Sequence, residues 1–259
     1  MDFFDLLLLA IIQGIAEFLP ISSSGHLVLA GHWLGIEEAQ GTLNIMLHAG
    51  TLLSIVVFYF QRIARLVYED RRVVPLLIVG TIPGALAGVL IKAYAEWLTE
   101  SAWLAASLLI VTGLILVAST RIKRPNPIDY RDAGWKVAIG VGLAQAFAIL
   151  PGISRSGATI CTGLWLGLKR ESAGTFSFLL AIPIIAGASA YEIRKQLKEG
   201  LTDDQGWGML ILGALISFVV GYIALYWLTK FIEKGKFHMF AWWCIPLGIF
   251  SLIMLGIFG

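Results

Sequence analysis

Ten apolar segments alternate with short polar stretches along the chain. They cover approximately residues 3–19, 21–36, 43–60, 73–91, 103–118, 135–150, 158–168, 175–191, 207–228 and 240–258. Periodicity does not separate helix from strand in such segments, but lengths above 15 residues favour helices, and a helix needs roughly 17–25 apolar residues to cross a bilayer. The pattern predicts an all-α polytopic membrane protein, with one membrane domain over 1–259.

Composition supports a membrane protein and excludes a soluble one. The chain of 259 residues is 58% hydrophobic and 14% charged, whereas soluble proteins carry about 25% charged residues. The net charge is +2, and the basic residues lie in loops instead of forming one face of an element. This arrangement gives no indication of a nucleic-acid partner.

Two polar loops interrupt the apolar segments, and they resemble each other. The first reads LPISSSGH at 19–26, and the second reads LPGISRSGA at 150–158. With a shift of 132 residues, the windows 13–35 and 145–167 agree at 10 of 23 positions. Such self-similarity marks a duplicated unit, and we place the repeats at about 1–120 and 133–259.

The segments beside these loops are too short and too closely joined to be ordinary pairs of spans. Irregular backbone at membrane depth is tolerated only where it faces protein or water. We therefore expect six transmembrane helices plus two re-entrant helix pairs, although four short full spans are an alternative. Three spans after each pair would give an inverted-topology repeat, which brings both loop tips together near the midplane.

Basic residues indicate the orientation of the chain. The loops 61–72, 119–136, 169–171 and 230–236 hold 14 Lys and Arg residues, whereas the opposite loops hold 4. The positive-inside rule places the first set in the cytoplasm and both termini outside.

The two loops differ at three positions that carry chemistry. Where the first has Glu17, Ser23 and His26, the second has Ile149, Arg155 and Ala158. An arginine fork suits phosphate, an ionisable group inside a membrane is a functional candidate, and His26 follows Ser23 by three residues, within reach for proton transfer. We expect Ser23, His26, Glu17 and Arg155 to be catalytic in a phosphoryl transfer, with Ser23 as nucleophile.

The other polar and glycine positions of the loops are candidates for binding substrate. Hydroxyls and free N–H groups at a helix N-terminus form a natural phosphate site. The candidates are Ser22, Ser24, Gly25, Gly152, Ser154, Ser156, Gly157 and Thr159. Serine-rich tips also cap helices, so a purely structural role stays open for the serines.

Glu17 and Gln13 are four residues apart and therefore share a helical face. Their oxygens suit a hard cation, so both are candidate metal ligands, Glu17 first; alternatively Glu17 orients a catalytic neighbour. Asn44 and His48, four apart on the third segment, either join the site or are satisfied interior residues.

The two motifs are similar to those of the undecaprenyl-diphosphatase family, the bacitracin-resistance membrane phosphatases. They are QGIAEFLPISSSGH, from Gln13 to His26, and PGISRSGAT, from Pro151 to Thr159. The resemblance extends over essentially the whole chain. The family's first motif begins with Glu or Gln. Because this chain has Gln13, a direct ligand role at position 13 is weakened, and Glu17 is the main candidate metal ligand.

The resemblance implies removal of the terminal phosphate of undecaprenyl diphosphate, which regenerates the carrier lipid of cell-wall synthesis. It also implies dependence on a divalent cation (Mg²⁺ or Ca²⁺), a bacterial inner membrane, where the charge distribution above places both termini in the periplasm, and competition with bacitracin for the same lipid. A homodimer stays open. The main rival is a lipid flippase, because inverted repeats are typical of transporters; an ion channel would need no nucleophile, and a serine protease would gain nothing from Arg155.

Overall fold

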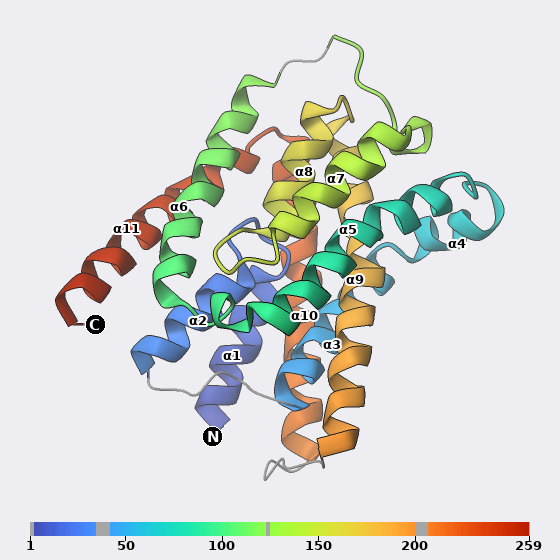
Figure 1. The fold of residues 1–259 in the computed structure, drawn as a ribbon. Coiled ribbons are helices and arrows are strands. Elements are labelled where there is room, and N and C mark those ends of the chain that lie inside the picture. The colour runs from blue at the N-terminus through green and yellow to red at the C-terminus, as the bar shows by residue number, and fades with distance from the viewer. Residues whose placement is uncertain (1–2, 35–41, 123–124, 200–206, 259) are drawn as a thin grey trace.

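A computed structural model describes residues 3–34, 42–122, 125–199 and 207–258. This part of the chain is helical, as predicted. Its α-helices are α1 Phe3–Ala16, α2 Ser23–Leu34, α3 Thr42–Phe58, α4 Phe60–Tyr68, α5 Val73–Tyr94, α6 Ala102–Ala118, α7 Trp135–Phe147, α8 Arg155–Trp165, α9 Arg170–Glu199, α10 Trp207–Glu233 and α11 Ala241–Phe258 (Figure 1). Short 3₁₀ turns lie at Glu96–Leu98, Ser119–Arg121, Tyr130–Asp132 and Phe237–Phe240.

The long helices match the predicted spans. Within the described residues, 5 helices are long and apolar enough to cross a membrane, and the number rises to 6 if the bent pair α3–α4 is one span. The bend of 67° falls at Tyr59, inside a segment that the hydrophobic pattern predicts as continuous. The buried Tyr59 ring stacks on Phe178 with centroids 5.9 Å apart, so packing on α9 holds the chain at the bend.

The remaining helices form two short pairs. Helices α1, α2, α7 and α8 contain 14, 12, 13 and 11 residues. At 1.5 Å per residue each is about 16–21 Å long, less than the roughly 30 Å hydrocarbon core of a bilayer. Their lengths favour the re-entrant arrangement, and the loops that join them lie side by side inside the bundle (Figure 1).

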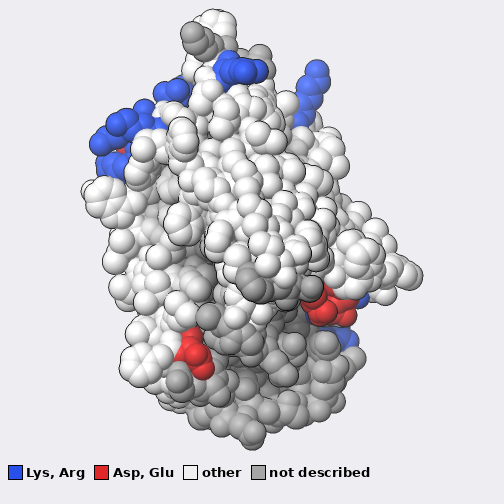
Figure 2. All heavy atoms as spheres, turned by 90° about the vertical axis from the view of Figure 1, so that its left-hand side faces the viewer, with Lys and Arg blue, Asp and Glu red and all other residues white. Residues whose placement is uncertain are grey.

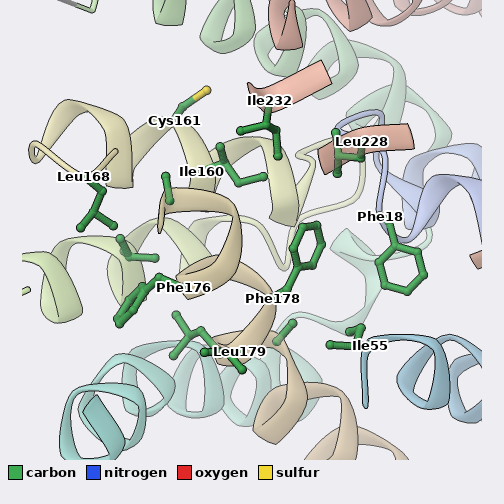
Figure 3. Close-up of a cluster of buried hydrophobic side chains, with 14 of the residues drawn as sticks. Phe18, Ile55, Ile160, Cys161, Leu168, Phe176, Phe178, Leu179, Leu228 and Ile232 are labelled. Carbon is green, nitrogen blue, oxygen red and sulfur yellow. The ribbon is translucent and has the colours of Figure 1, made fainter. Parts of the chain in front are cut away.

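Helices from both halves of the chain enclose these loops. α10 packs on α1 and α3, α11 on α6, and α5 on α7 and α9. Phe18, Phe176 and Phe178 are fully buried in the largest apolar cluster (Figure 3). Close helix approach requires small residues: a Cβ at Gly50 would collide with the backbone of Ala214.

Charge is concentrated at the ends of the bundle. Lys and Arg side chains gather at one end of the face shown in Figure 2, and the broad surface between the ends carries few charges. Large apolar side chains are also exposed on the long helices, among them Ile78 and Leu86 on α5 and Leu215 on α10. An apolar band between charged ends is the surface that a bilayer requires.

Candidate active site

The two polar loops are in direct contact, as the sequence predicts. The Ser22 hydroxyl accepts hydrogen bonds from the backbone N–H of Gly152 (3.1 Å) and of Gly25 (3.2 Å). A Cβ atom added to Gly25 would lie 2.8 Å from the Gly152 nitrogen. A side chain at position 25 would therefore push the loops apart.

Helix α6 holds the second loop in its shape. Gly152 has φ +93°, a conformation that favours glycine, and its carbonyl accepts a bond from the Thr112 hydroxyl at 2.7 Å. The same hydroxyl accepts from the Ser154 N–H at 3.0 Å. Sequence reasoning missed Thr112, because a lone threonine in an apolar segment carries no distinctive signal.

The repeated serines cap the helices that follow the loops. Ser154 accepts from the Gly157 N–H at 3.1 Å, as Ser22 accepts from Gly25. The other serines that the two loops share, Ser24 and Ser156, lie beside these caps. The Ser24 hydroxyl is 3.4 Å from that of Ser22, and the Ser156 hydroxyl is 3.1 Å from that of Ser154. The capping role left open from the sequence is therefore present for Ser22 and Ser154.

Thr159 lies one turn further along α8, where its hydroxyl has protein partners. It donates to the Arg155 carbonyl (2.7 Å) and lies 2.6 Å from the Ser177 hydroxyl. These contacts make Thr159 part of the packing between α8 and α9.

Glu17 is the centre of the polar contacts between the loops. One carboxylate oxygen, Oε1, accepts from Arg155 Nη2 at 2.6 Å, across 138 positions of sequence. The other, Oε2, accepts from Ser23 Oγ at 3.0 Å and from Gln13 Nε2 at 3.1 Å. The Glu17 and Arg155 side chains are only 8% and 14% exposed, so this ion pair is enclosed and depends on both loops.

A small cavity of about 70 Å³ opens beside this ion pair. It is lined by both loops, at Ala16, Glu17, Ser22, Ser23, Ser24, Ala148, Ile153, Ser154 and Arg155. Arg155 Nη1 is buried and has no acceptor among the described residues. A buried guanidinium nitrogen without an acceptor is costly unless an anion binds it, so the cavity suits a phosphate group.

His26 has partners other than Ser23. Its Nδ1 lies 2.8 Å from the Ser22 carbonyl, and its Nε2 accepts from the Trp243 indole N–H at 2.8 Å. Because a carbonyl can only accept, Nδ1 carries the proton. The spacing predicted that His26 lies within reach of Ser23, but in the structure the Ser23 hydroxyl donates to Glu17. The histidine beside Glu17 is His48, whose Nε2 lies 4.0 Å from Glu17 Oε2.

Fold and site together define a class: a multi-pass membrane protein with an enclosed site that combines a serine, a carboxylate and an arginine. Known sequences specify it further. The family model "Bacitracin resistance protein BacA" matches residues 6–250, and the chain belongs to this family.

Full-length relatives agree with the family assignment. The chain is 48% identical to an undecaprenyl-diphosphatase of Rhodopirellula baltica over 247 residues, 95% of this chain and 96% of the relative. It is 38% identical to that of Halothermothrix orenii, with both chains covered completely. A third, from Desulforapulum autotrophicum, is 36% identical over 98% of each chain.

Proposed function

We propose that this protein is an undecaprenyl-diphosphatase, which hydrolyses undecaprenyl diphosphate to undecaprenyl phosphate and inorganic phosphate. The observation that carries the proposal is the contact chain Ser23–Glu17–Arg155, which joins both loops around a cavity that suits phosphate. Full-length relatives with this activity in their names support it. Bacitracin would compete for the same lipid.

In the first step, Ser23 Oγ attacks the terminal phosphorus. Its proton passes to Glu17, the acceptor of its hydrogen bond. The bond to the bridging oxygen breaks, and undecaprenyl phosphate leaves with the electron pair and the proton from Glu17. Arg155, through its free Nη1, stabilises the charge that develops on the transferring group.

In the second step, water attacks the phosphorus of phosphoserine. The phosphorus–Oγ bond breaks, one proton of the water passes through Glu17 to Ser23 Oγ, and inorganic phosphate is released. The enzyme returns to its starting state without any other reactant.

His26 takes no part in these two steps in the arrangement that the structure shows. In the structure, Trp243 occupies its Nε2, and the two rings stack with centroids 6.2 Å apart. We propose that His26 moves protons at the site only after the half-exposed Trp243 side chain has turned away. The other bond of His26, to Ser22, keeps its ring beside the first loop.

A divalent cation fits this site only if it is shared with the diphosphate. Mg²⁺ is commonly held by one or two carboxylates together with substrate phosphates, and the described residues include no cluster of three His, Cys, Asp or Glu. The oxygens that fit are those of Glu17 and the buried Oε1 of Gln13, which has no hydrogen-bond partner in the described part of the chain. We therefore propose Mg²⁺ or Ca²⁺ bound here, which would neutralise diphosphate charge.

Replacing Glu17 by Gln tests this role. Loss of a carboxylate ligand should raise the cation concentration needed for half-maximal activity on the order of tenfold or more. A cation titration of phosphate release, on protein checked for monodispersity, measures it. Collapsed turnover with an unchanged cation requirement would show that Glu17 acts only on Ser23.

The architecture we propose is an inverted-topology repeat with both termini periplasmic. It is supported by the matching pairs α1–α2 and α7–α8, by the contact between their loops, and by the 14-to-4 distribution of basic residues. A site reached from between helices near the midplane suits a substrate that stays in the bilayer.

Single cysteines, introduced after Cys161 and Cys244 have been replaced, test the orientation. A membrane-impermeant maleimide should label exposed Phe4→Cys and Ile257→Cys in intact cells, and Arg131→Cys only after lysis. The reverse labelling pattern would invert the topology.

The alternative is a lipid flippase, which the proposed repeat would also suit. Purified protein in detergent, given a polyprenyl diphosphate with Mg²⁺ or Ca²⁺, separates the two functions. We expect inorganic phosphate to be released without any membrane. Transport of the lipid across vesicles with no phosphate released would establish the flippase instead.

A further inference from the structure

His48 on α3 faces the carboxylate at the centre of the site. Its Nε2 lies 4.0 Å from Glu17 Oε2, the same oxygen that accepts the Ser23 hydroxyl proton. The His48 side chain is 30% exposed, whereas that of Glu17 is 8% exposed. His48 is therefore the more exposed of the two groups.

The ring orientation of His48 is fixed by its own helix. Nδ1 lies 2.9 Å from the Asn44 carbonyl, one turn earlier. Because the carbonyl can only accept, Nδ1 donates, and in the neutral form of the ring this leaves Nε2, the nitrogen 4.0 Å from Glu17, as an acceptor. His48 differs in this respect from His26, because the Nε2 of His26 already accepts a hydrogen bond from Trp243.

Two acceptors 4.0 Å apart do not bond directly, but one water can donate a proton to each. At ordinary hydrogen-bond lengths of about 2.8 Å, this separation requires an angle near 90° at the water oxygen, close to that between its two O–H bonds. The oxygen lone pairs of such a water then face away from both acceptors. Ser23 Oγ bonds to the same carboxylate oxygen, so a phosphoryl group on Ser23 would lie next to it.

We propose that His48 is a positioning residue which, with Glu17, holds the water that hydrolyses phosphoserine. This inference rests on the function and the covalent route proposed above. The water forms its bond to phosphorus while the bond to Ser23 Oγ breaks, and Glu17 passes one of its protons to Ser23. Holding a nucleophilic water in line is a recurrent requirement of phosphoryl transfer.

Two substitutions separate this role from packing. His48→Phe keeps a planar ring without nitrogen, and His48→Gln keeps an acceptor. Exposed His32→Gln, on α2, is the matched control. Purified proteins are mixed with undecaprenyl diphosphate and cation, and the reactions are stopped in denaturant. Undecaprenyl phosphate, inorganic phosphate and phosphoserine are then measured, the last by mass spectrometry.

For His48→Phe we expect steady-state phosphate release to fall on the order of 100-fold, the cost of a misplaced reactant. Release of undecaprenyl phosphate should still show a first turnover at near wild-type rate, and phosphoserine should accumulate on Ser23. His48→Gln should recover part of the rate, and His32→Gln should match wild type.

Three results would overturn the role of His48. They are normal steady-state turnover in His48→Phe, a slowed first turnover with no phosphoserine, and a shifted cation requirement that makes His48 a ligand. Failure of the proposed function is distinct, because the wild-type protein would then release no phosphate at all.

Discussion

Replacing Arg155 by Lys is expected to lower kcat/KM on the order of 10³-fold, within the range that a catalytic arginine contributes to phosphoryl transfer. Lysine keeps the positive charge beside Glu17 but lacks the planar fork. In the structure, one nitrogen of that fork, Nη2, donates to Glu17 at 2.6 Å, and the other, Nη1, is buried with no acceptor in the part of the chain that the structure describes. A single ammonium group cannot serve Glu17 and a phosphate in the same geometry.

The choice of Lys separates catalysis from folding. Removing one partner of a buried ion pair typically destabilises a protein by about 3–5 kcal/mol, so Arg155→Ala could fail to fold. Arg155→Lys avoids an unpaired Glu17, and Arg72→Lys, in an exposed pair with Asp132, is the matched control. Near-normal phosphate release by a well-folded Arg155→Lys protein would make Arg155 a structural residue.

Much of the fold could be predicted because the bilayer restricts it. Long apolar segments must become helices, and the predicted segments all match helices of the structure. The break at Tyr59 could not be predicted, since residues 55–60 are continuously apolar and the bend depends on packing against Phe178 of α9. Local sequence carries no information about that partner.

The composition of the site was also accessible from sequence, through the repeated loops. Asymmetry between the copies predicts Glu17, Ser23 and Arg155 as candidate site residues, and the structure brings these three into contact. The pairing within the site was not accessible. Spacing favoured His26 as the neighbour of Ser23, whereas the hydrogen bond of His26 to Trp243 spans 217 positions and depends on how α11 packs.

Replacing Ser23 by Ala is expected to abolish turnover, with a loss of at least about 10³-fold, as for other enzymes that lose a nucleophile. The sequence alignment of the two loops places Ser23 opposite Arg155, and the Ser23 hydroxyl donates to the buried Glu17 carboxylate at 3.0 Å. The neighbouring hydroxyl of Ser22 is occupied by the N–H groups of Gly152 and Gly25. Ser23 is therefore the serine of this pair whose hydroxyl proton can pass to a base, the Glu17 carboxylate.

The competing mechanism is direct attack by water, with Ser23 only positioning the substrate. Single-turnover measurements of phosphate release and of phosphoserine distinguish the two mechanisms. If water attacks directly, Ser23→Ala shows only a partial defect, and the wild-type protein forms no phosphoserine. Exposed Ser107→Ala on α6, whose hydroxyl donates to the Trp103 carbonyl one turn earlier, is the control for a lost serine hydroxyl. Substantial residual turnover in Ser23→Ala would remove Ser23 as nucleophile, yet Glu17 and Arg155 would still hold the phosphate for hydrolysis by water.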